Sequence, residues 1–180
     1  MNKIVVGIDP GLDGAIAVIV DGVLVDVVDM PVIETTSLGK AKFNGTDIVK
    51  RDAVTRKVNP QGLADYLRHW APTPARSVHV YIEQVGARPD QGVSSAFSFG
   101  AGFGILLGVA AALSMVYTTT YPQTWKKAMS CTADKNLSRT RAQALFPAKA
   151  AMFARAKDDG RAEASLIAAY GYRQLYGVGV

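Results

Sequence analysis

The chain opens with three apolar runs separated by turn residues. Their β-branched content predicts three strands, which cover Ile4 to Ile8, Ala15 to Val20 and Val23 to Val28. Asp9 stands near the end of the first run, where Pro10-Gly11 forces a turn, and Asp21-Gly22 is a strong hairpin signal. An acid in a sheet is costly to bury without a partner, so Asp9 points to a metal ion or to phosphate-directed chemistry.

The next part of the chain alternates between polar and amphipathic patterns. A polar stretch from Met30 to Asn59 is interpreted as an expanded basic loop, either a solvated insertion or an arm that contacts nucleic-acid phosphates. Pro60 to Trp70 has apolar residues at helical spacing and a proline suited to the first turn. Val78 to Glu83 then reads as a fourth strand, which also delivers an acid at its end.

A long apolar segment follows Gly92 and ends near Met115. Small residues recur in it at every fourth position, namely Gly92, Ala96, Gly100, Gly104, Gly108 and Ala112. Glycine disfavours a helix by about 1 kcal/mol, so we expect close backbone approach, either to the sheet or to a symmetry mate. The segment is almost long enough for a membrane span, but the serines at its start favour a buried helix of a soluble protein.

The last third of the chain predicts one more strand and further helices. Met115 to Thr120 is the strand, a helix opens near Lys135 and runs to about Phe146, and the last helix begins at Asp158-Asp159. No repeat, low-complexity tract or linker interrupts the pattern. We therefore expect residues 1–180 to form a single α/β domain with a mixed sheet.

Composition narrows the chemistry. With 180 residues, 49% hydrophobic and 19% charged, the chain is typical of a compact soluble protein. Its net charge of +5 is a weak signal for a polyanionic partner. The single cysteine, Cys131, excludes an intramolecular disulfide and a cysteine-based zinc site, and only two histidines are present. A metal site would therefore rest on carboxylates, which favours Mg²⁺ or Mn²⁺.

The acids that stand out are Asp9, Glu83, Asp159 and Glu163. Residues four apart share one helical face, so the last two can point at one site, and Asp9 and Glu83 join them if their strands are neighbours. Each acid also has a simpler explanation: a turn residue for Asp9, a charge that complements the helix dipole for Asp159, and a solvated helix residue for Glu163. The preceding acid, Asp158, is best explained as a helix N-cap.

The chain resembles the RuvC-type Holliday junction resolvases of the RNase H-like, or retroviral integrase, superfamily. The matching motifs are Gly7-Ile8-Asp9-Pro10-Gly11, Ile82-Glu83-Gln84-Val85, the glycine-rich helix, Tyr121-Pro122-Gln123-Thr124-Trp125-Lys126 and Ala162-Glu163-Ala164. This resemblance implies an RNase H-like fold, with a five-stranded mixed sheet flanked by helices. It also implies a homodimer that binds four-way DNA junctions in recombination and repair and makes paired, Mg²⁺-dependent nicks. Other branched DNA is a further candidate substrate.

The resemblance assigns roles to particular residues. Asp9 would bridge two Mg²⁺ ions, for which Mn²⁺ would substitute, Glu83 would hold one of them, and Asp159 and Glu163 would complete the coordination. The residues expected to contact DNA are Lys126, Lys127, Lys135, Arg139 and Arg141. Small size and the basic loop are similar to bacteriophage-encoded members, which suggests a cytoplasmic location in a bacterial cell or phage-infected host.

The sequence departs from the family pattern at the last two acids. Glu163 stands where an aspartate is typical, and the acids are four apart, with Gly160 at the position three before Glu163. These departures leave open whether Asp158 or Asp159 is the ligand. They also support a second reading, a catalytically inactive relative that binds branched DNA. A third, an ATP-binding protein with an actin-type fold, requires two such domains and hence a longer chain.

Overall fold

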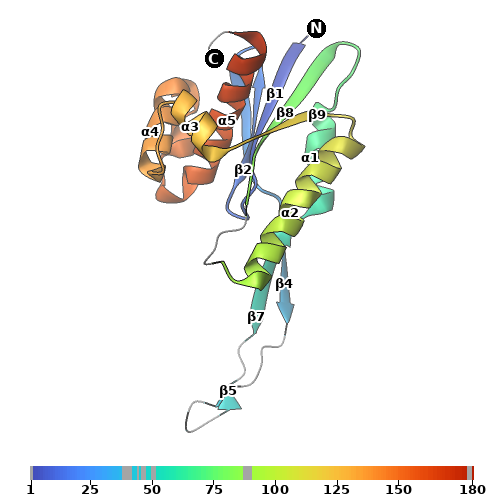
Figure 1. Cartoon of the computed structure of the whole chain (residues 1–180), viewed down its shortest axis with the longest axis vertical. Helices are drawn as coiled ribbons and strands as arrows, with labels where there is room; N and C mark the ends of the chain where they lie inside the picture. Colours follow the sequence, from blue (N-terminus) through green and yellow to red (C-terminus); the bar gives the residue numbers. More distant parts are fainter. Residues whose placement is uncertain are drawn as a thin grey trace.

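A five-stranded mixed sheet forms the centre of the protein, as the computed structural model shows in Figure 1. The strand order is β3 (Val23–Asp29), β2 (Ala15–Val20), β1 (Asn2–Asp9), β8 (Arg76–Glu83) and β9 (Val116–Thr120). The first three pair antiparallel, and β1–β8 and β8–β9 pair parallel. The structure describes residues 2–37, 42–43, 45, 48–49, 52–86, 91–177 and 180. The predicted fold class is confirmed.

Helices cover both faces of this sheet. One face carries α1 (Pro60–Trp70) and α2 (Val93–Ala112). The other carries α5 (Asp159–Tyr176), with α3 (Pro122–Ala128), α4 (Lys135–Leu145) and the 3₁₀ segments Pro147–Phe153 and Ala156–Asp158 around it. The prediction of α1 from Pro60 to Trp70 is confirmed at both ends. At its start, Pro60 lies in the first turn and the Asn59 side chain accepts a hydrogen bond from the Gly62 amide.

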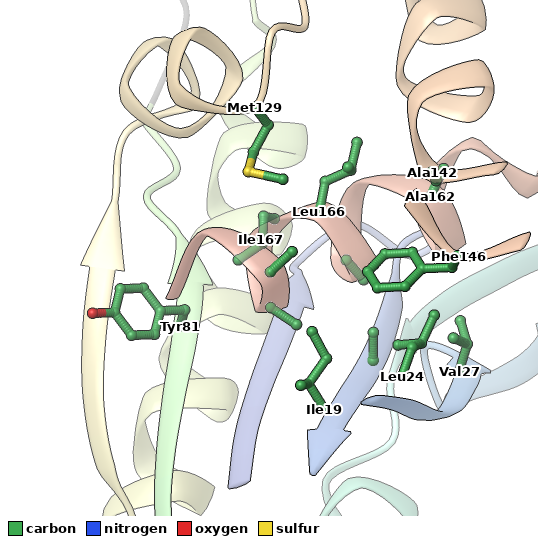
Figure 2. Packing of buried hydrophobic residues seen from close by; sticks show 14 of the residues in the cluster. Ile19, Leu24, Val27, Tyr81, Met129, Ala142, Phe146, Ala162, Leu166 and Ile167 are labelled. Atoms are coloured by element: carbon green, nitrogen blue, oxygen red, sulfur yellow. The ribbon is translucent and has the colours of Figure 1, made fainter. Parts of the chain in front are cut away.

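The core on the α5 face depends on very close backbone contact. A Cβ atom at Gly7 of β1 would lie 2.3 Å from the Ala164 oxygen and the Ala168 nitrogen of α5, and one at Gly171 would lie 2.4 Å from the Tyr81 ring. Figure 2 shows how Leu166 and Ile167 of this helix pack among side chains of the sheet and of the neighbouring helices. The close approach of α5 to the sheet therefore depends on residues that lack a side chain.

The small-residue stripe of α2 does not face the sheet. The helix residues buried there are Gly102, Leu106 and Ala110, whereas a Cβ atom at Gly100, Gly104 or Gly108 would meet nothing within 4 Å. The expectation of a buried helix is wrong for this face, because Gly102, Leu106 and Ala110, on the opposite face of the helix, make the buried contacts instead. The first alternative for the stripe, packing against the sheet, is therefore wrong, and packing against a symmetry mate stays a prediction. The helix is long and apolar enough to cross a membrane. A single helix of this kind, packed on a sheet, is weak evidence for a membrane span.

The stretch predicted as a loop contains a β ribbon. Strands β4 (Val32–Ser37) and β7 (Ala53–Val58) pair antiparallel and project from the end of the sheet, followed by the short pair β5 (Lys42–Phe43) and β6 (Ile48–Val49) (Figure 1). The loop prediction is wrong because Val, Ile and Thr residues favour strands even among charged neighbours. We call residues 32–58 the arm. Lys40, Lys50 and Arg51, which suggested a basic surface, lie outside the described residues.

Candidate functional site

The site lies at the edge of the sheet where two parallel strands end. Ile8 of β1 is paired with Ile82 of β8, so the next residues, Asp9 and Glu83, end their strands side by side. The start of α5 adds Asp159 and Glu163 from the covering layer. The topology brings Glu83 and Glu163 close enough to Asp9 to act on its charge, and the joint site of four acids stays a prediction.

The environment of Asp9 is electrostatically unfavourable for a carboxylate. Burial is the largest cause that raises the pKa of Asp9 to about 7, and the negative charges of Glu163 and Glu83 raise it further. The Gly11 amide and Lys135 act in the opposite direction. A group whose charge is disfavoured by neighbouring acids is one that a bound cation would stabilise.

Glu83 is held by an aromatic residue of α3. The Trp125 Nε1 atom donates a hydrogen bond to Glu83 Oε2 over 2.7 Å, and the tryptophan side chain is fully buried. An indole N–H is a donor only, so this contact requires the carboxylate oxygen to act as the acceptor.

Glu163 is buried and bonded to two side chains. Its Oε1 atom accepts hydrogen bonds from Lys126 Nζ at 2.8 Å and from Ser138 Oγ at 3.2 Å. The Lys126–Glu163 pair is among the least exposed ion pairs described, with side-chain exposures of 17% and 11%. Because both charges are largely removed from water, loss of either partner would leave the other uncompensated.

The two neighbouring aspartates at the start of α5 have different partners. Asp159 accepts a hydrogen bond from Lys135, which raises the pKa of that lysine. Asp158 is almost fully buried and is bonded by the Arg155 guanidinium and the Arg155 amide, and these contacts lower the pKa of its carboxyl group. It makes no side-chain hydrogen bond to the amides of α5, so the N-cap interpretation is wrong in its contacts.

The spacing of four between the α5 acids has a steric cause. A Cβ atom at Gly160 would lie 2.3 Å from the Asp13 oxygen and 2.9 Å from the Gly14 Cα atom. The first turn of α5 therefore rests on the backbone of the loop that follows Asp9, and no side chain fits at position 160. An acid cannot stand at position 160, three residues before Glu163. The acid of this turn that contacts Lys135 is therefore Asp159, four residues before Glu163.

A cleft of about 1990 Å³ opens beside Glu83 and Glu163. Glu83, Glu163 and the lysines of the following helices line one side of it, and residues 55–58 of the arm and the first turns of α2 line the other. Arg56 of the arm bonds Asp13 at 2.7 Å and the Leu12 carbonyl at 3.2 Å, which ties the arm to the loop after Asp9. Phe97, 77% exposed, stands in the same cleft.

The basic residues predicted to contact DNA divide into two groups. Lys126, Lys127 and Lys135 line the cleft. Arg139 and Arg141 instead donate hydrogen bonds to the backbone carbonyls of Ala154 and Met129, outside the residues that line it. The first group therefore lies where it would contact a phosphate near the acids. The second group stabilises the helices behind the cleft.

Reasoning from the sequence did not identify the side chains that hold the acids. Trp125 was noticed only as part of a motif, and Ser138 and Arg56 carried no signal of a partner. In the described part of the chain, no three Asp, Glu, His or Cys side chains lie close enough together to hold a metal ion. The donor set still fits a hard divalent cation, because it consists of carboxylate oxygens around an acid whose charge is disfavoured.

Comparison with known proteins supports the fold. No protein-family model and no curated protein matches the sequence. Among solved structures, T. thermophilus RuvC in complex with a Holliday junction substrate matches with a TM-score of 0.55 and 14% identity over 99% of both chains. A second Thermus thermophilus RuvC structure matches with a TM-score of 0.51 and 14% identity over 96% of both chains. The resemblance stated from the motifs is confirmed at the level of the fold: the chain folds as RuvC does.

Proposed function

We propose that the protein is a metal-dependent DNA endonuclease that resolves four-way junctions. The observation that carries the proposal is the convergence of Asp9, Glu83 and Glu163 beneath a lysine-lined cleft. The likeness to a RuvC structure solved with a Holliday junction supports the choice of substrate. Cytoplasmic action on branched DNA during recombination and repair follows from the same proposal.

The residues that would hold two Mg²⁺ ions are Asp9, Glu83, Asp159 and Glu163. Bound there, the ions would supply an activated water nucleophile and stabilise the leaving oxygen of a phosphodiester. The chain itself contributes fixed orientation, because Glu83 and Glu163 each have a short hydrogen bond from α3. Lys126 and Lys135 form ion pairs with Glu163 and Asp159. When a cation bound, each lysine would have to release its carboxylate or share it with the cation.

Two further features suit a DNA substrate. Lys127 is exposed beside the acids, where it would contact a phosphate and contribute salt-dependent affinity. The exposed Phe97 is not a core residue, and its ring would be free to stack on a base at the opened crossover.

The proposed enzyme is a homodimer, since two sites are needed for paired nicks. Support comes from α2, where the glycine stripe is exposed on the face opposite its contact with the sheet. A second copy of the helix would approach closely along this stripe.

A catalytically inactive relative that binds branched DNA is the second candidate. Two observations favour it. The acids of the described residues form no ready-made metal cluster, and lysines are already paired with Glu163 and Asp159.

The experiment that tests the proposal is nicking of a substrate panel in Mg²⁺. The panel comprises a four-way junction, a three-way junction, a flap and a linear duplex of the same sequence. We expect paired nicks near the crossover of the four-way junction only. Cutting of all branched forms would broaden the activity to a debranching nuclease, and equal cutting of the duplex would contradict the proposal.

A further inference from the structure

The short helix α3 holds the site through two adjacent residues. Trp125 donates to Glu83 and Lys126 donates to Glu163, so one turn of helix contacts one acid of the sheet and one acid of the helix that covers it. The Lys126 ammonium also lies 5.1 Å from the centroid of the Trp125 ring. A small movement of α3 would therefore move both carboxylates together.

Trp125 is suited to fix an orientation. Its ring is fully buried within the core cluster on the α5 face, which includes Met129, Phe153 and Leu166, so the indole cannot turn away from the acid. The hydrogen bond from Trp125 Nε1 to Glu83 Oε2 is 2.7 Å long, at the short end of the range for N–H···O bonds. Trp125 itself is shielded from the cleft and is not among the residues that line it.

We propose that Trp125 is a positioning residue that sets the orientation of the Glu83 carboxylate toward the reaction site. The inference rests on the proposed nuclease function for its catalytic consequence. The bond itself is a property of the folded chain and is measurable without activity. Trp125 acts through Glu83 and contacts no substrate.

The first arm of the test is kinetic. Trp125→Phe keeps an aromatic ring and removes the N–H donor, and Trp70→Phe is the matched control because Trp70 lies on α1, away from the site. We expect kcat for junction nicking to fall about 10- to 100-fold in Trp125→Phe, the rate equivalent of one hydrogen bond to a charged group. KM and junction affinity should stay within about twofold of wild type, as expected when only the reacting geometry is lost.

A tryptophan analogue separates the donor from the bulk of the ring. Benzothienylalanine at position 125 has sulfur in place of the indole N–H and nearly the same shape. It should lower kcat as much as Trp125→Phe does. Wild-type kcat with this analogue would overturn the proposal, since the ring volume alone would then account for the effect.

The second arm is spectroscopic and does not require nicking. The chain has two tryptophans, so its ¹H–¹⁵N spectrum should contain two indole signals, which Trp70→Phe assigns. We expect Glu83→Gln to shift the Trp125 signal and speed exchange of its proton while the Trp70 signal stays in place. An unchanged Trp125 signal would overturn the proposed contact. If wild type does not nick but this arm succeeds, the nuclease function fails and the positioning of Glu83 stands.

Discussion

Two helices rich in small residues cover the two faces of the sheet, and they use those residues in opposite ways. On the α5 side, Gly7, Gly171 and Gly160 each face backbone or ring atoms at less than 3 Å from where a Cβ atom would stand. On the α2 side, Gly100, Gly104 and Gly108 face open space. Similar composition therefore has two meanings: close packing within the chain in one case, and an unpartnered surface in the other.

The difference matters for the chemistry. Close packing of α5 against β1 and the loop after Asp9 is what brings Glu163 near Asp9, and burial disfavours the charge of Asp9. The α2 side contributes no acid, and its first turns form a wall of the cleft. The helix on one face of the sheet thus contributes acids to the candidate site, and the helix on the other face exposes its small residues.

The largest effect is expected from filling the α5 contact. Gly7→Ala places a methyl group 2.3 Å from two backbone atoms of α5, so strand and helix must separate. We expect a loss of about 3 kcal/mol or more in the free energy of unfolding, at the upper end for overpacking of a core. Urea denaturation measures it. Equal stability of Gly7→Ala and wild type would contradict the described contact.

The second-largest effect is expected from the charge of Asp9, whose removal should stabilise the folded protein. Because the pKa of Asp9 is raised to about 7 from 3.8, the folded state loses stability as the pH rises from about 4 to 7. Asp9→Asn should therefore stabilise the metal-free protein at pH 8 by a few kcal/mol, and little at pH 4. Thermal melts in EDTA at both pH values test this.

The matched control for Asp9 is an acid with the opposite shift. Hydrogen bonds from Gln61 and Arg68 lower the pKa of Asp65, so Asp65→Asn should not stabilise the protein at pH 8. Mg²⁺ should raise the melting temperature of wild type and not that of Asp9→Asn. If Asp9→Asn raised the melting temperature equally at pH 4 and pH 8, the result would show that the charge of Asp9 is not disfavoured in the folded state.

The paired aspartates at the start of α5 should separate stability from activity. Asp158→Asn breaks the buried contacts with Arg155 and should cost about 1–3 kcal/mol in unfolding free energy. Asp159→Asn should leave stability nearly unchanged and reduce nicking. Denaturation and nicking rates of both variants test the assignment, and equal loss of nicking without loss of stability in Asp158→Asn would reverse it.

The smallest change in stability is expected on α2. Gly104→Ala adds a methyl group with nothing within 4 Å, so the monomer should gain up to about 1 kcal/mol from helix propensity. If the stripe packs on a second copy, Gly104→Leu should at the same time dissociate the dimer. Light scattering over a range of concentrations measures it, and an unchanged dimer would exclude this face as the interface.

The sequence was sufficient for the elements whose signals are local. The strand that ends at Asp9, helix α1 and the last strand were predicted within one or two residues, because alternation, capping and proline act over a few positions. The arm was missed because its strands are polar and pair across a long insertion. The buried side of α2 was not predictable, because small residues occur on both of its faces: Gly102 and Ala110 are buried, and Gly104 is exposed.

For the site, the acids were predictable and their partners were not. Asp9 and Glu83 end apolar strands, which is a visible pattern. The Trp125–Glu83 bond joins residues 42 positions apart and leaves no periodicity in the sequence. Asp158 and Asp159 differ in the direction of their side chains, which a 3₁₀ turn and Arg155 determine.

The most direct test of the nuclease assignment is junction nicking in Mg²⁺ by wild type and Asp9→Asn, with junction affinity measured in EDTA for both. We predict paired nicks by wild type, none by Asp9→Asn, and affinities within about threefold, since Asp9 lies among the acids and not among the phosphate-binding lysines. Binding of the junction by wild type without nicking in either Mg²⁺ or Mn²⁺ would contradict the account and favour an inactive DNA-binding relative.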